Sequence, residues 1–552
     1  MKFNLLKNFS KFKSNIIMTS VILSSIASSL TIVSANNVNS GKWMSGEYHI
    51  HTIQSNDASE EFMNIQNILN VAFRQNMGIL PKEAKTENIK YGKTFDYVMF
   101  ADHLRNSPRS VYGEDKLTAR WEAILEQQKE IEKLKSQGKY ENKIIYSGFE
   151  WDMMGLDHAS VAIIDEKSQD VPYEGVHQFE WLFSYDTKDE VFKQNEKSLY
   201  GERINDKNSV NDTYEAVKWL SKNYPKSFVL PNHPSRHNNG DDVVDLGEVS
   251  IEHLRRLNDI DSNIVFGFEG MPGNQMAGEG SCELPQEDIR AGADEMISVT
   301  GGVWDALLSE GRRFYNFANS DFHFKISSNK EYGSGYWPSE FSRNYTWVET
   351  GEDGVYDFRD VVDGMRSGNS YSVNGELISD LQFNVKKDEN LATMGEQLNV
   401  DKNSEVEVNI RFKVPNNNNY KTIYNSNTGL KATNTPKLDH VDLIMGHVTG
   451  KVDEDNYSST QNTDAKIVET FDISKLKVDS EGYYNLTYKT KVDSNMYFRI
   501  RGTSSNLVDE NGDPVTHERE VALSTQFRHD QINDYNYTNL SFYANPIWVN
   551  AN

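Results

Sequence analysis

The chain has 552 residues, a formal net charge of −25 and a single cysteine, and each number excludes a class of protein. The length exceeds what one hydrophobic core usually organises, so we expect two domains. The excess of Asp and Glu would repel DNA and anionic lipid over most of the surface, which argues against nucleic-acid binding by charge. Cys282 has no partner cysteine, so cross-links within the chain are excluded.

Residues 1–35 have the pattern of a secretory signal peptide. Four lysines between positions 2 and 13 precede an apolar stretch at 16–33, and small residues end at Ala35. The alternative is an uncleaved anchor, because an apolar stretch of this length just spans a bilayer; its many Ser and Thr residues favour cleavage. Cleavage would leave a charge of −29, since the leader holds four Lys and no acid. We expect no stable membrane insertion afterwards, and an extracellular bacterial protein without disulfides, with noncovalent attachment to the cell surface as a variant.

Strand-like and helical segments alternate between residues 41 and 375. Short apolar runs predict strands at 95–100, 143–148, 227–230 and 314–317, and amphipathic or capped segments predict helices at 115–137, 211–220, 250–257, 301–309 and 356–367. This alternation predicts a mostly parallel sheet, open or closed into a barrel. Residues 165–206 and 325–343 show no clear period, and we interpret both as loops over the site that decide specificity.

After Gly375 the pattern changes to alternating apolar and polar residues separated by Asn- and Asp-rich turns. This pattern is typical of an antiparallel β domain, and we expect a sandwich. The predicted division is therefore a signal peptide at 1–35, a first domain at 36–376 and a β-rich C-terminal domain at 377–552.

Histidines and carboxylates stand beside the predicted strands in a series of short motifs. The motifs are EYHIH at 47–51, ADH at 101–103, GFE at 148–150, DH at 157–158, NHP at 232–234 and SDFH at 320–323. Because the carboxyl ends of parallel strands meet on one face, we expect these side chains to converge. Imidazole and carboxylate are the ligands that many divalent metals prefer. The sequence therefore predicts a metal site that uses six of the 13 histidines.

The ordered set HxH, DH, isolated Glu, HP and SDxH resembles the PHP (polymerase and histidinol phosphatase) family of metal-dependent phosphoesterases, especially secreted members with a β-rich C-terminal domain. The likeness covers residues 41–376. It implies a distorted, TIM-barrel-like (β/α)7 fold that holds two to three divalent ions, either Zn, Mn or Fe. The implied ligands are His49, His51, Glu150 and Asp321 for the first metal, a shared Glu150 with His158 and His233 for the second, and Asp57, His103 and His323 for the third. Asn56 occupies the position at which the family commonly has the acid of the first motif, and Asp57 follows it.

A bridging carboxylate such as Glu150 can hold two ions roughly 3.5–4 Å apart, and a hydroxide between them can attack phosphorus in line. Arg105 and Arg236 follow the strand ends and are predicted to neutralise the substrate oxygens. His237 is the predicted general acid. We interpret Asp102 as an orienting or capping residue. Glu269 ends a predicted strand at the same face, and we interpret it as a solvated carboxylate, with a role in supporting the metal ligands as the alternative.

These features predict an exported hydrolase of phosphate monoesters or diesters, whose substrate is a small anionic ester or a cell-wall polymer. The first alternative is a carbamate or carboxylic ester hydrolase with the same nucleophile. The second is a surface protein that binds glycan or wall through its β domain and holds structural metals. Open loops beside a complete ligand set argue against this second alternative.

Overall fold

The computed structural model describes residues 41–60, 62–76, 94–236, 249–273, 289–323, 337–351, 354–416, 437–515 and 539–552. The predicted signal peptide, His237, Cys282 and most of the predicted loop at 325–343 lie outside these ranges. Residues 40–552 form one compact unit. Among the helices in the described ranges, none combines the length and the apolar character needed to cross a membrane.

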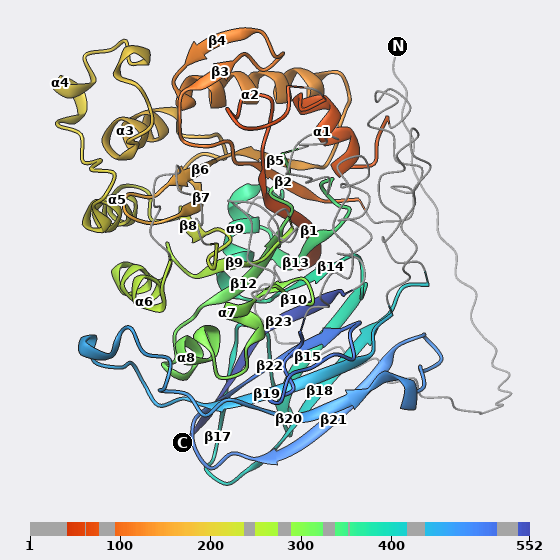
Figure 1. The fold of residues 1–552 in the computed structure, drawn as a ribbon. Coiled ribbons are helices and arrows are strands. Elements are labelled where there is room, and N and C mark those ends of the chain that lie inside the picture. The colour runs from red at the N-terminus through yellow and green to blue at the C-terminus, as the bar shows by residue number, and fades with distance from the viewer. Residues whose placement is uncertain are drawn as a thin grey trace, which may run out of the picture. The chain divides into compact units, whose positions relative to one another are not determined.

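The largest sheet contains ten strands from the beginning, middle and end of the chain. They are β1 (Gly41–Ile50), β2 (Tyr97–Phe100), β5 (Ile144–Ser147), β13 (Ser342–Glu349), β14 (Ser370–Asn374), β17 (Gln397–Val400), β19 (His440–His447), β20 (Lys466–Asp472), β22 (Met496–Thr503) and β23 (Ser541–Ala551). Their order is β20-β19-β22-β23-β14-β13-β1-β2-β5, with β17 also paired to β23. Figure 1 shows the blue C-terminal strands continuing through β14 and β13 to the red β1.

Five smaller sheets complete the described strands. A four-stranded sheet has the order β16 (Asn390–Thr393), β15 (Asp380–Lys387), β18 (Glu405–Lys413) and β21 (Tyr484–Lys491). A three-stranded sheet joins β6 (Phe149–Asp152), β7 (His158–Ala162) and β8 (Phe228–Pro231). The pairs are β3 (Ser107–Arg109) with β4 (Asp115–Thr118), β9 (Gly267–Pro272) with β12 (Tyr315–Asn319), and β10 (Ile289–Arg290) with β11 (Ala293–Asp294).

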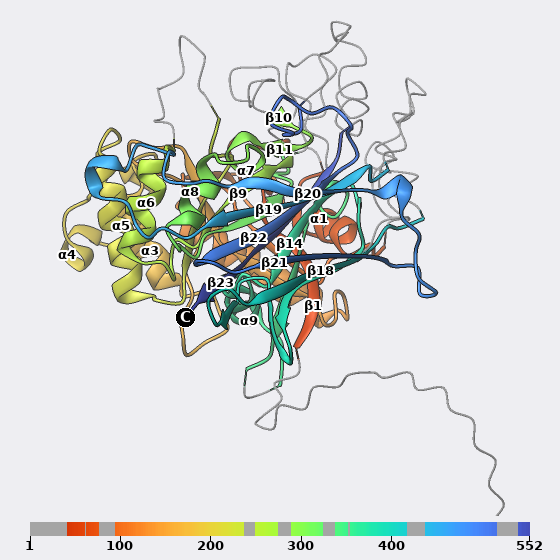
Figure 2. The same ribbon diagram turned by 90° about the horizontal axis from the view of Figure 1, so that it is seen from below.

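The predicted helices are present with small shifts at their ends. The described helices are α1 (Ile65–Ala72), α2 (Arg120–Ser136), α3 (Tyr173–Phe183), α4 (Glu196–Tyr200), α5 (Val210–Asn223), α6 (Ile251–Ile260), α7 (Glu295–Ser298), α8 (Val303–Ser309) and α9 (Phe358–Ser367). Ser209 is the N-cap residue of α5 and Ser250 is the N-cap residue of α6. Residues 115–118 form a strand instead of the first turn of α2. Figure 2 shows α3, α5 and α6 grouped on one side of the sheets.

The predicted fold class, a distorted (β/α)7 barrel followed by an antiparallel β-sandwich-like domain, is wrong. Strand β1 pairs in parallel with β2 but antiparallel with β13, and β6, β7 and β8 are antiparallel throughout. The described residues hold nine helices, too few to alternate with the strands of this large mixed sheet. Strand β23 pairs with β14, so one sheet continues from the C-terminal strands into the first part of the chain. Alternation along a sequence does not specify which strands pair, because pairing depends on contacts between distant residues. The predicted boundary near residue 376 falls between β14 and β15 and stays a prediction.

Aromatic packing brings together the strands whose ends carry the candidate ligands. The Tyr48 ring on β1 meets Phe228 on β8 edge-on at 5.6 Å and Phe317 on β12 at 5.8 Å between centroids. All three rings are buried, and burying each stabilises the fold by about 1.5–3 kcal/mol. This core fixes β1, β8 and β12 side by side, which places the residues at their carboxyl ends in one region.

The segment at 165–206 is not the featureless loop that its sequence predicts, because it contains α3, η4 (Asp189–Val191) and α4. Glu180 of α3 fastens this segment to α2. Its carboxylate accepts hydrogen bonds from the backbone N–H groups of Arg120 (2.7 Å) and Trp121 (2.9 Å), the first residues of α2. A carboxylate at a helix N-terminus satisfies N–H groups that have no partner within the helix.

Burial raises the pKa of Glu180 to about 7, against the lowering effect of these hydrogen bonds. A carboxyl whose pKa rises on folding contributes stability that is complete below its unfolded pKa of 4.5 and is lost as the pH approaches 7. We therefore compare the free energies of unfolding of the wild type and of Glu180→Gln. The advantage of the wild type should decrease as the pH rises from 4.5 to 7, by at most about 1.4 kcal/mol per pH unit. Urea denaturation at several pH values measures this difference. Parallel stability curves for the two proteins would contradict the prediction.

Candidate metal centre

The candidate ligands stand at or just beyond strand ends, and two isolated bridges lock the segments together. His49 lies near the end of β1 and His51 directly follows the strand. A parallel bridge joins Ile50 to Phe322, which lies between Asp321 and His323. A second parallel bridge joins His103 to Glu150. These backbone contacts explain why residues that are up to 274 positions apart lie in one buried region.

Four residues form the first donor group: His49, His51, Glu150 and Asp321. The His49 Nε2 atom lies 3.2 Å from the Nε2 of His51, 3.2 Å from Glu150 Oε1 and 3.2 Å from Asp321 Oδ1. Donors that sit about 2.0–2.1 Å from a tetrahedral metal are separated by roughly 3.3 Å, so these spacings match the edges of a coordination shell. The group is identical to the predicted ligand set of the first metal, and all four side chains are buried.

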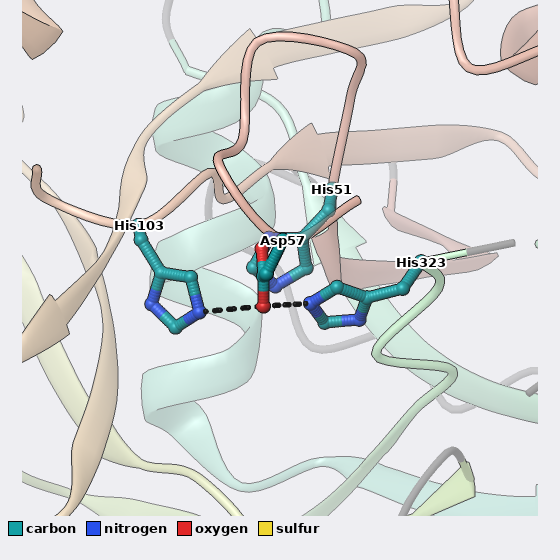
Figure 3. A group of neighbouring side chains, drawn as sticks. All are labelled: His51, Asp57, His103 and His323. Carbon is teal, nitrogen blue, oxygen red and sulfur yellow. Dashed lines mark hydrogen bonds and ion pairs between the residues drawn. The ribbon is translucent and has the colours of Figure 1, made fainter. Parts of the chain in front are cut away.

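A second donor group contains His51, Asp57, His103 and His323. Figure 3 shows the Asp57 carboxylate between the His103 and His323 rings, with His51 behind it. Asp57 Oδ2 lies 3.2 Å from His103 Nε2 and 3.0 Å from His323 Nε2. The Asp57 side chain is 29% exposed, so this group is the side of the centre that solvent reaches. The residue shift at Asn56 therefore does not remove Asp57 from the cluster.

The remaining groups extend the cluster toward β7 and β8. One contains His103, Glu150 and His158, and the other Asp157, His158 and His233. Glu150 Oε1 lies 3.1 Å from His158 Nδ1 and 3.3 Å from His233 Nε2, so the residues predicted for the second metal are also brought together. Asp157 joins His158 and His233 in one of these groups but was not among the predicted ligands. The signal was present, because Asp157-His158 repeats the acid–histidine pair of the ADH motif.

Four of these histidines point one ring nitrogen into the cluster and have the other held by a backbone carbonyl or by a side chain outside the donor groups. The outer contacts are His49 Nδ1 with Glu269 Oε2 (2.8 Å), His51 Nδ1 with Ser55 Oγ (3.0 Å), His158 Nε2 with Asp152 Oδ1 (3.0 Å) and His323 Nδ1 with the Asp321 carbonyl (2.8 Å). Partners of this kind fix the tautomer and the ring orientation of metal-binding histidines. The residues present therefore fit a divalent metal in both donor type and orientation.

The interpretation of Glu269 as a solvated carboxylate is wrong. Its side chain is fully buried and contacts both His49 and the Asn319 amide, which donates to Glu269 Oε2 at 2.8 Å. Asp102 was interpreted as an orienting or capping residue, but within the described ranges its side chain hydrogen-bonds to neither a candidate ligand nor the N-terminal N–H groups of a helix. Asp102 belongs to none of the donor groups found among the described residues, and it accepts hydrogen bonds from the Thr52 backbone N–H and hydroxyl. These bonds hold the loop that follows His51.

Two candidate ligands adopt an unusual backbone conformation. Asp321 has φ 48° and His233 has φ 29°, in the left-handed region that costs energy for residues other than glycine. Their side chains enter the cluster from these turns, at the ends of β12 and β8 respectively. Strain at this position is typical of functional sites, where the surrounding structure maintains it.

Mutual contacts between carboxylates and histidines shift the pKa values within the cluster. Burial raises the pKa of Glu150, but the histidines around it outweigh this effect and hold its pKa well below the ordinary value. Burial and the nearby Arg105 lower the pKa of His103 to about 4. Nearby carboxylates raise the pKa of His49 well above its ordinary value despite burial. Metals and protons compete for such donors.

Both predicted arginines lie at the rim, held by carboxylates at the ends of the β6–β7 hairpin. Arg105 Nε donates to Asp152 Oδ2 at 2.9 Å, and Arg236 Nε donates to Asp157 Oδ2 at 2.8 Å. Arg105 Nε also lies 3.3 Å from Asp186 Oδ2, so the 165–206 segment contacts the rim. His237, the predicted general acid, is outside the described residues.

No protein-family model matches the chain, and neither the curated proteins nor the solved structures contain a match. The evidence for a function therefore comes from the structure, in which buried groups of His, Asp and Glu could hold metal ions.

Replacing Glu269 by glutamine is expected to weaken metal binding by about 10- to 100-fold, because the charged partner of His49 is lost. Chelator competition with Zn or Mn would measure the affinity. Glu132→Gln, on the exposed face of α2, is the matched control. Unchanged affinity in Glu269→Gln would mean that the strand alone orients the His49 ring.

Proposed function

We propose that this chain is a metal-dependent hydrolase of phosphate esters, acting on monoesters or diesters. The observation that carries the proposal is that neighbouring donor groups share members. Glu150, His51, His103 and His158 each belong to two of the four groups. A purely structural site is usually closed by its own four ligands, whereas shared ligands hold ions at the close spacing of multi-metal hydrolases.

The proposed cofactors are two to three divalent ions, either Zn, Mn or Fe, since a mixture of imidazole and carboxylate suits all three metals. When bound, such ions supply Lewis acidity and lower the pKa of water. The ordered motifs from His49 to His323 support this assignment through their resemblance to PHP phosphoesterases.

The chain's own contribution is to hold charge and orientation around the reacting group. The Arg105 and Arg236 guanidinium groups are fixed at the rim by Asp152 and Asp157. A guanidinium has more N–H donors than one carboxylate uses, so each can also donate to a substrate oxygen. This arrangement favours an anionic substrate, either a small phosphate ester or an anionic wall polymer outside the cell. His237 stays the proposed proton donor to the leaving group.

The test is hydrolysis by the purified protein supplied with Mn or Zn, with a chromogenic phosphomonoester, a phosphodiester and a carboxylic ester compared. Phosphate-ester turnover should disappear in Asp321→Asn and persist in Asp401→Asn, a matched change at an exposed position. Turnover of the carboxylic ester alone would replace the proposal with a carbamate or carboxylic ester hydrolase. No turnover despite bound metal would favour a surface protein that binds glycan or wall.

A further inference from the structure

A cavity lies at the opposite end of β1 from the metal centre. Its volume is about 430 Å³, within the roughly 300–1,000 Å³ range of small-molecule sites. Trp43 and Ser45 line it from β1, and Trp43 precedes His49 by six residues. At the rise of an extended strand this separation is roughly 20 Å, so the cavity is distinct from the donor groups.

Aromatic rings form one side of this cavity. Ser45 pairs with Tyr345, and Tyr345 pairs with Tyr371, so these residues form a row across β1, β13 and β14 on one face of the sheet. The two tyrosine rings stack with centroids 4.8 Å apart and planes inclined by 15°. Trp43 meets Tyr371 edge-on at 5.5 Å and is partly exposed. Tyr345 and Tyr371 are buried, at 6% and 3% exposure, so Trp43 provides the accessible aromatic surface and the tyrosines hold it in place at low entropic cost.

Hydrogen-bonding groups line the rest of the cavity. They include two carboxylates, Asp96 and Asp380, and the hydroxyls of Thr94 and Ser379, while no lysine or arginine is among the described lining residues. Both carboxylates already have a protein partner. Asp96 Oδ2 accepts from the Ser45 N–H at 2.9 Å, and Asp380 Oδ2 accepts from the Tyr483 hydroxyl at 2.6 Å.

This lining selects among ligand classes. Two carboxylates without a lining cation disfavour an anion such as the proposed phosphate ester. Lys143 lies 3.7 Å from Asp96 and reduces the negative charge there, which weakens the case for an organic cation. A neutral ligand with many hydroxyls fits both the aromatic side and the carboxylates of the cavity. Its C–H face can pack on an aromatic ring, and its hydroxyls can donate to the carboxylates.

We propose that this cavity binds a sugar unit of an uncharged glycan. The ring face of the sugar packs against Trp43, which the buried tyrosines support from behind, and its hydroxyls donate to Asp96 and Asp380. The proposal is independent of the metal centre and of hydrolysis, because it uses none of the donor-group residues.

The experiment is calorimetric titration of the full chain with cellotetraose and with chitotetraose, and separately with choline. Binding of one oligosaccharide should weaken by at least about tenfold in Trp43→Ala and in Asp380→Asn. Binding should be unchanged in Tyr112→Ala, which removes an exposed aromatic elsewhere. It should also persist in Asp321→Asn, which separates this proposal from the proposed function.

Circular dichroism would confirm that each variant is folded before its affinity is compared. The proposal is overturned if neither oligosaccharide binds the wild type at millimolar concentration, or if Asp380→Asn and Trp43→Ala bind as the wild type does. Binding of choline without either sugar would overturn it as well, in favour of a site for organic cations.

Discussion

Glu150→Gln is expected to bind metal with an affinity more than about 100-fold below that of the wild type. This decrease is larger than the one expected when a residue that only orients a ligand is replaced. The Glu150 carboxylate lies within 3.3 Å of a ring nitrogen on five histidines: His49, His51, His103, His158 and His233. Glutamine keeps the size of the side chain and can still accept the Asn232 hydrogen bond, but it removes the charge that balances a shared cation. Elemental analysis after dialysis would measure the bound metal, and phosphate-ester turnover should fall with it.

Glu389→Gln is the matched control for this substitution because Glu389 is exposed. It should retain the metal content of the wild type. Wild-type metal content in Glu150→Gln would show that Glu150 is not a ligand, and the proposed bridging of two ions would then be wrong.

Asp305→Ala is expected to lower the free energy of unfolding by about 3–5 kcal/mol. Asp305 on α8 is fully buried and accepts from Arg499 on β22 through Nε at 2.7 Å and Nη2 at 2.6 Å. The Tyr497 hydroxyl also donates to Asp305 Oδ1 at 2.8 Å. Removing the carboxylate leaves the Arg499 charge buried without its counter-ion, and that uncompensated charge is the source of the cost.

Urea denaturation would measure this loss of stability. Two comparisons identify its cause. Asp305→Ala/Arg499→Met should recover much of the stability, because the unpaired charge is gone. Glu215→Ala breaks an exposed pair with Lys218 and should cost less than about 1 kcal/mol. A loss of that small size in Asp305→Ala would mean that water or another group compensates Arg499.

The donor groups show how far local sequence patterns extend to a site. The nine predicted ligands were chosen from motif order and position beside strands, and the structure places all nine in the donor groups. The two-residue spacing within the HxH and DxH motifs follows a local rule, since residues at i and i+2 on a strand point to the same side. Asp157 was not assigned to the site, and Glu269 was preferred as a solvated carboxylate. Their contacts with Arg236 and His49 join residues that lie 79 and 220 positions apart.

The prediction of the fold failed where it depended on pairing between distant strands. The strand at 95–100 was predicted and corresponds to β2, and an antiparallel β domain was predicted for the region after Gly375 that contains β23. Two features depend on the folded sheet. Strand β23 pairs with β14, and β1 has a parallel neighbour on one side and an antiparallel neighbour on the other. Periodicity reports which face of a strand is buried, and this is compatible with many pairings.

The amino-acid sequence by itself determined the local elements and the kinds of ligand. Each helix cap, alternating strand or His–carboxylate motif depends on residues that lie within a few positions of one another. Only the tertiary structure decided the sheet order, the partners of each histidine ring and the burial of Glu269. Those features arise from contacts between segments such as β1 and β12, which meet because their aromatic side chains share one core.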